Sequence, residues 1–110
     1  MDIALLIPSA RLPEIGPVPG AVLLTYGNAL DLVVTLRATA NPVVIWSDDL
    51  DEESLEAVAA AVRDRQGACI EVRSKGWDGQ TFSPLSAACR GVISGFGVRG
   101  LAAAAALVRG

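Results

Sequence analysis

The stretch GVISGFGVRGLAAAAALVRG, residues 91–110, decides the fold expected for this chain. A short apolar strand around residues 92–93 is followed by glycines at the spacing G-x-G-x-x-G, and then by an alanine-rich helix over residues 101–108. Glycines at this spacing allow a tight turn from strand to helix and close packing of the two elements. The stretch therefore predicts a strand of a parallel sheet with a helix packed against it.

The chain upstream of residue 91 continues this alternation of strand and helix. Strand patterns cover residues 3–7, 21–26, 43–46 and 68–74, and from residue 21 on each is followed by a helical pattern, over residues 29–39, 49–65 and 83–90. Strands that alternate with helices form parallel sheets with right-handed crossovers and helices on both faces. We predict a single domain, residues 1–110, with a small three-layer Rossmann-like or flavodoxin-like α/β fold and a mainly parallel sheet of about four or five strands.

Three strands have patterns that suggest their place in the sheet. Residues 43–46 are continuously apolar, as in a central strand buried on both faces. Residues 1–20 are predicted to form a first edge strand or arm, followed by a proline-rich connection, and the arm packs on its own domain or on a second subunit. Residues 68–74 place Cys69, Glu71 and Arg73 on one partly polar side, which favours a position toward an edge of the sheet.

Two helix starts carry capping signals. Asn28 is expected to cap the helix that begins at Ala29. Asp49 followed by Glu52 has the spacing of a capping box, with Asp49 in the cap role. The acids over residues 48–53 either offset the helix dipole or bind a metal ion, and we favour the first interpretation and expect no metal site.

Composition excludes several classes of function. Hydrophobic residues make up 52% of the chain and charged residues 19%, which predicts a packed core. The net charge of −3 argues against a nucleic-acid partner, and the absence of histidine excludes a Ser-His-Asp or Cys-His nucleophile. Cys69 and Cys89 lack metal-site spacing and are expected to be core residues. With no signal-peptide pattern or membrane span, we expect a cytoplasmic protein with no membrane partner.

A site is expected at the carboxyl edge of the sheet, where ligands of open parallel sheets bind. The predicted ligand-binding residues follow successive strands and are Asp48, Lys75, Trp77, Ser94, Gly95, Gly97, Arg99 and Gly100. Free N–H groups at the start of the last helix suit a phosphate, Arg99 or Lys75 adds positive charge, and Trp77 can cover an apolar moiety. In the alternative interpretation the glycines serve only turning and packing. A full dinucleotide site is disfavoured because the chain stops before the acidic residue expected about 20 residues on.

These observations favour a small non-catalytic binding module that recognises a nucleotide or another phosphorylated ligand. No nucleophile with a nearby base and no catalytic pair of carboxylates can be identified in the sequence, so catalysis is not expected. The alternative is a protein-protein interaction or self-assembly module with no small-molecule ligand. A homodimer is the first expectation for its assembly, and no cofactor can be named.

Overall fold

The computed structural model describes residues 3–15, 21–39, 41–47, 50–65, 68–73, 85, 88–89, 91–94, 100–101 and 103–104. Within these ranges the elements are β1 Ile3–Pro8, the 3-10 helix η1 Ser9–Glu14, β2 Ala21–Tyr26, α1 Ala29–Ala38, β3 Val43–Trp46, α2 Glu52–Asp64, β4 Cys69–Arg73 and β5 Gly91–Ser94. Gly100, Leu101, Ala103 and Ala104 are also helical. Among the described residues, no helix has the length and apolar character needed to cross a membrane.

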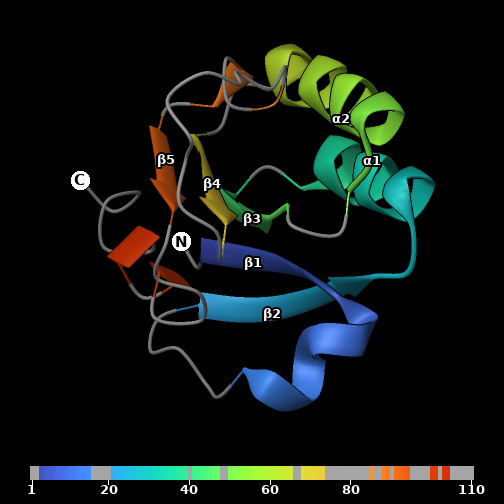
Figure 1. Cartoon of the computed structure of the whole chain (residues 1–110). Coiled ribbons are helices and arrows are strands. Elements are labelled where there is room, and N and C mark those ends of the chain that lie inside the picture. The colour runs from blue at the N-terminus through green and yellow to red at the C-terminus, as the bar shows by residue number, and fades with distance from the viewer. Residues whose placement is uncertain are drawn as a thin grey trace.

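The sheet has five strands in the order β2-β1-β3-β4-β5, and every pair of neighbours is parallel (Figure 1). This confirms the predicted α/β class, and the strand order is the flavodoxin-like one. The chain first moves outward from β1 to β2 and then returns past β1 to β3. The strand order thus reverses between β1 and β3, which is where sheets of this kind bind their ligands.

Two predictions about strand position were wrong. β1 is not an edge strand or arm, because β2 and β3 pair with it on either side. All six of its residues are buried, as a central strand requires. β4 is also internal, between β3 and β5, so the charged residues in it do not mark an edge. β2 and β5 are the edge strands, and Val22 and Thr25 of β2 are exposed.

Side chains that alternate along the strands build one core on each face of the sheet. In β1, Ala4 and Leu6 belong to the face covered by α1 and α2, which lie side by side (Figure 1). The opposite face contains Leu5 and Trp46 and is covered by Leu101 and its helical neighbours. The two cores make the domain three layers thick, as predicted.

Both long helices follow a strand through a short connection and are capped by a side chain. Asn28 caps α1 as predicted, since its Oδ1 accepts from the Asp31 N–H at 2.9 Å. The cap of α2 is Asp51 and not Asp49, because the Asp51 carboxylate accepts from the Ser54 N–H at 2.7 Å. These hydrogen bonds satisfy N–H groups that have no partner within the helix. They place both helix starts at the carboxyl edge of the sheet.

The opposite, amino edge of the sheet is organised by Arg65, which follows α2. Its guanidinium donates to the carbonyl of Thr39 at 2.8 Å and to those of Asn41 and Ala68. Thr39 ends α1, while Asn41 and Ala68 precede β3 and β4. One side chain therefore holds three chain segments together where the strands begin. Burial lowers the pKa of Arg65 from its ordinary value, and Cys69 partly opposes this.

Candidate functional site

Most of the residues predicted to bind ligand lie outside the described residues: Asp48, Lys75, Trp77, Gly95, Gly97 and Arg99. Ser94 ends β5 in register with Arg73, so the backbone of this predicted residue does reach the carboxyl edge. Gly100 is buried in the helical segment next to Leu101. Phosphate binding at the glycine turn stays a prediction.

A buried carboxylate lies in the middle of β4 and reaches toward the carboxyl end of the neighbouring strand β3. Glu71 is 1% exposed, and the Ser47 hydroxyl donates a hydrogen bond to its Oε2. Ser47 directly follows β3, and its backbone N–H donates to the Val72 carbonyl at 3.1 Å, which holds Ser47 against β4. A buried charge needs such partners to offset its loss of hydration. The hydroxyl and the carboxylate therefore have a defined mutual orientation.

Arg73 adds a positive charge next to this pair. Its Nε lies 3.9 Å from Oε2 of Glu71, and its side chain is 33% exposed. Residues two apart in a strand point to the same face of the sheet, which explains the contact. The cation reaches solvent, whereas the carboxylate is screened from it.

Tyr26 ties the edge strand to the centre of the sheet. Its hydroxyl donates to the carbonyl of Trp46 at 2.5 Å, although β1 lies between β2 and β3. The buried side chain of Tyr26 therefore crosses the end of β1, at the point where the strand order reverses. The Ser9 hydroxyl donates to the Tyr26 carbonyl at 3.3 Å and fixes the start of η1 to the same place.

A second cation lies at this reversal point, on the face opposite Tyr26. The guanidinium carbon of Arg11, in η1, is 5.9 Å from the centroid of the Trp46 ring, which is a cation-π distance. The indole Nε1 of Trp46 is buried and makes no hydrogen bond within the part of the chain that the structure describes. Polar groups thus lie on both faces of the sheet near its carboxyl edge. Glu71, Ser47 and Tyr26 lie on the face covered by α1 and α2, and Arg11 lies over Trp46 on the opposite face.

The central member of this site was missed by sequence reasoning. Glu71 was expected on a partly polar side of a strand near an edge, but β4 is internal and Glu71 faces the core under α2. Ser47 was not among the predicted ligand-binding residues. The available signal was a lone acid between Ile70 and Val72 in an otherwise apolar strand, since acids are rarely fully buried without a partner.

Comparison with known proteins identifies the fold. No family model matches the chain, and no curated protein sequence matches it. The crystal structure of a type II dehydroquinase from Propionibacterium acnes is similar, with a TM-score of 0.76 over 97% of this chain and 96% of that chain. The two chains are 19% identical. This likeness shows the flavodoxin-like fold that the strand order also gives.

The comparison corrects the expected function. A structure that matches nearly the whole chain is that of an enzyme, which contradicts the interpretation as a non-catalytic binding module. The alternative of an interaction or self-assembly module without a small-molecule ligand is contradicted by the same finding. That interpretation relied on the absence of a recognisable catalytic pair in the sequence. The fold brings Ser47 and Glu71 into contact across 24 positions, a distance at which no local motif is visible.

Proposed function

We propose that this protein is an enzyme that binds a small anionic substrate at the carboxyl edge and transfers protons through Glu71. The single observation that carries the proposal is the buried contact between Glu71, in the middle of β4, and Ser47, which follows the carboxyl end of β3. The similar fold of an enzyme over 97% of the chain supports it.

Glu71 is suited to acid-base chemistry by its surroundings. A carboxylate can take a proton from a substrate and return it to another atom, and this role requires a fixed position. The Ser47 hydroxyl fixes one oxygen, and α2 and the neighbouring strands keep bulk water away. The chain contains no histidine, so a carboxylate is a natural candidate for this step.

The two arginines explain the choice of an anionic substrate. Arg73 borders the carboxylate, and Arg11 lies over Trp46 at the point of strand reversal. Guanidinium groups bind carboxylates and phosphates through charge-assisted hydrogen bonds. The Trp46 indole N–H is a further donor for a substrate oxygen. Dehydroquinate, after which the similar enzyme is named, is the first substrate to assay.

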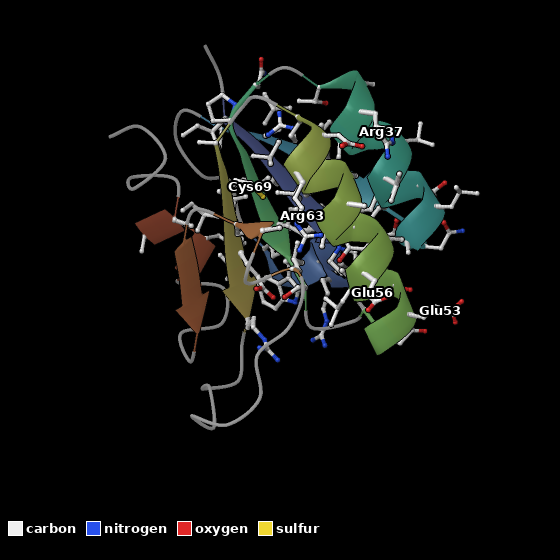
Figure 2. The ribbon with its side chains drawn as sticks, turned by 90° about the horizontal axis from the view of Figure 1, so that it is seen from above. Arg37, Glu53, Glu56, Arg63 and Cys69 are labelled. Carbon is white, nitrogen blue, oxygen red and sulfur yellow. The ribbon has the colours of Figure 1, made fainter. Side chains whose placement is uncertain are left out.

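The test compares Glu71→Gln with wild type in a substrate-consumption assay, followed by NMR, on dehydroquinate and a panel of hydroxylated carboxylates. Glutamine keeps the shape and an acceptor oxygen but cannot transfer the proton. We expect kcat to fall by about 100-fold or more, with the folded structure retained. The matched control is Glu56→Gln, which changes an exposed carboxylate on the outer side of α2 (Figure 2). It should leave kcat unchanged.

Two results would contradict the proposal. In the first, wild-type protein neither consumes nor binds any of these compounds in calorimetric titration. In the second, Glu71→Gln turns over substrate at the wild-type rate.

A rise in KM for Arg11→Gln at unchanged kcat would assign Arg11 to binding of the anion.

A further inference from the structure

Two cysteine thiols that the proposed reaction does not use are in contact. Cys69 lies in β4 and is 3% exposed, and Figure 2 shows it on the strand beside α2. Cys89 follows the helical residue Ala88, shortly before β5, and is half-buried. The two Sγ atoms are 3.5 Å apart, and both cysteines are free.

The fold holds these sulfur atoms together from two directions. Cys69 pairs in register with Val43 of β3, so its backbone is fixed inside the sheet. The Cys89 N–H donates to the carbonyl of Leu85 at 3.0 Å, and Leu85 is fully buried in the core beneath the helices. A disulfide has an S–S distance of about 2.05 Å, so the sulfurs need to approach by about 1.5 Å. Side-chain rotation supplies much of such a movement.

We propose that Cys69 and Cys89 are a redox-sensitive pair that forms an intramolecular disulfide by exchange with a low-molecular-weight disulfide such as glutathione disulfide. The Cys89 thiolate attacks one sulfur of glutathione disulfide, whose S–S bond breaks and releases one glutathione thiolate. The Cys69 thiolate then attacks Sγ of Cys89 and displaces the second glutathione. The protein loses two electrons and two protons, and two glutathione molecules gain them.

The order of the two steps follows from exposure. Cys89 is the more accessible thiol, so it meets the soluble disulfide first, and the buried Cys69 resolves the mixed disulfide. The hydrogen bond with Cys69, burial, and the negative charge of Glu71 raise the pKa of the Cys89 thiol. Exchange is therefore slow at neutral pH and accelerates as the pH rises, because the thiolate is the attacking species.

The bond would link two parts of the chain that lie 20 positions apart. It would join β4 to the turn before β5, two residues from Glu71 and on the same face of the sheet. The disulfide closes a loop and restricts the unfolded chain, so oxidation should stabilise the fold. This inference does not depend on the reaction proposed for Glu71.

The experiment incubates the folded full chain with glutathione disulfide and follows it by intact mass and by alkylation of free thiols. We expect loss of two hydrogens without added glutathione, no free thiol, and a thermal midpoint higher by about 5 °C or more. Dithiothreitol should reverse all three changes. Cys69→Ala should instead accumulate a mixed disulfide on Cys89, and Cys89→Ala should remain unmodified.

Three outcomes would overturn the inference. The thiols could both remain free in the folded protein and react only after denaturation. The disulfide could link two chains, which a non-reducing gel would reveal. Glutathione could remain attached to wild-type Cys89 as stably as it does in Cys69→Ala. Cys69→Ser and Cys89→Ser provide second variants if either alanine substitution prevents folding.

Discussion

At the amino edge of the sheet a single arginine binds backbone carbonyls, whereas at the carboxyl edge three polar residues contact one another through their side chains. Arg65 donates to three backbone carbonyls from segments that precede or follow regular elements. Ser47, Glu71 and Arg73 form a chain of side-chain contacts at the opposite edge. The first arrangement provides hydrogen-bond donors for backbone carbonyls that lie outside the helices and strands. The second places a carboxylate that is 1% exposed in the core.

The difference separates polar groups that stabilise the fold from polar groups that are proposed to act in the reaction. Buried backbone carbonyls must find donors in any protein, so Arg65 is explained by stability alone. A buried ion pair is often no better for stability than apolar residues of similar volume. Stability alone therefore does not explain the buried Glu71. Removing polar groups at the two edges should have different consequences.

The largest effect is expected at the amino edge. Arg65→Met keeps much of the apolar stem but removes all three hydrogen bonds, so the free energy of unfolding should fall by about 2 to 4 kcal/mol. Urea denaturation measures this loss. The matched control is Arg63→Met, because Arg63 is exposed and lies on the last turn of α2, just before Arg65 (Figure 2). It should change stability by less than about 0.5 kcal/mol. Equal effects of the two substitutions would remove the distinction between the edges.

A smaller effect is expected for Tyr26→Phe at the carboxyl edge. The substitution keeps the ring but leaves the Trp46 carbonyl without the Tyr26 hydroxyl, which should cost about 1 to 2 kcal/mol. Thr25→Val, on the same strand but exposed, should be nearly neutral. Thermal unfolding of the two variants checks the difference. An unchanged midpoint for Tyr26→Phe would mean that β2 does not depend on this link across β1.

The smallest effect concerns the cap of α2 and appears only in acid. The backbone hydrogen bond from Ser54, and then that from its side chain, lower the pKa of Asp51 below its ordinary value of 3.8. The folded state thus favours the carboxylate, and this stabilisation is present above the unfolded pKa and lost as the pH falls through the folded pKa. Asp51→Asn keeps an acceptor oxygen but does not titrate.

The stability difference between wild type and Asp51→Asn should therefore be constant above about pH 5 and shrink below it. Chemical denaturation from pH 7 to pH 2 measures it. A difference that is the same at every pH would show that the charge of Asp51 contributes nothing to the cap.

Local signals in the sequence predicted the fold class well. Asn28 before a helical pattern, and the apolar run Val43–Trp46, indicated elements that the structure has in those places. Their physical basis is local, since a cap bonds three residues on and a buried strand needs only apolar neighbours. The Asp51 cap was missed because several acids in a row satisfy the same local rule.

The strand order and the site depend on contacts that no local pattern encodes. The sequence of residues 3–8 fits a central strand and an edge strand equally well. Only the pairing with both β2 and β3 shows that this strand is central. The role proposed for Glu71 likewise depends on its contact with Ser47, which follows another strand. The glycine turn led to a predicted ligand site at residues 95–100, whereas the contacts of the proposed site involve Ser47 after β3 and Glu71 and Arg73 in β4.

The position of Trp46 makes its intrinsic fluorescence a reporter of binding at the proposed site. The chain has two tryptophans, and Trp46 lies under Arg11 with the Tyr26 hydroxyl on its carbonyl. A Trp77→Phe variant leaves Trp46 as the sole indole emitter, surrounded by groups proposed to meet the substrate. An anion that draws the guanidinium off the ring changes the electric field at the indole, and the emission of one residue then reports occupancy without any label.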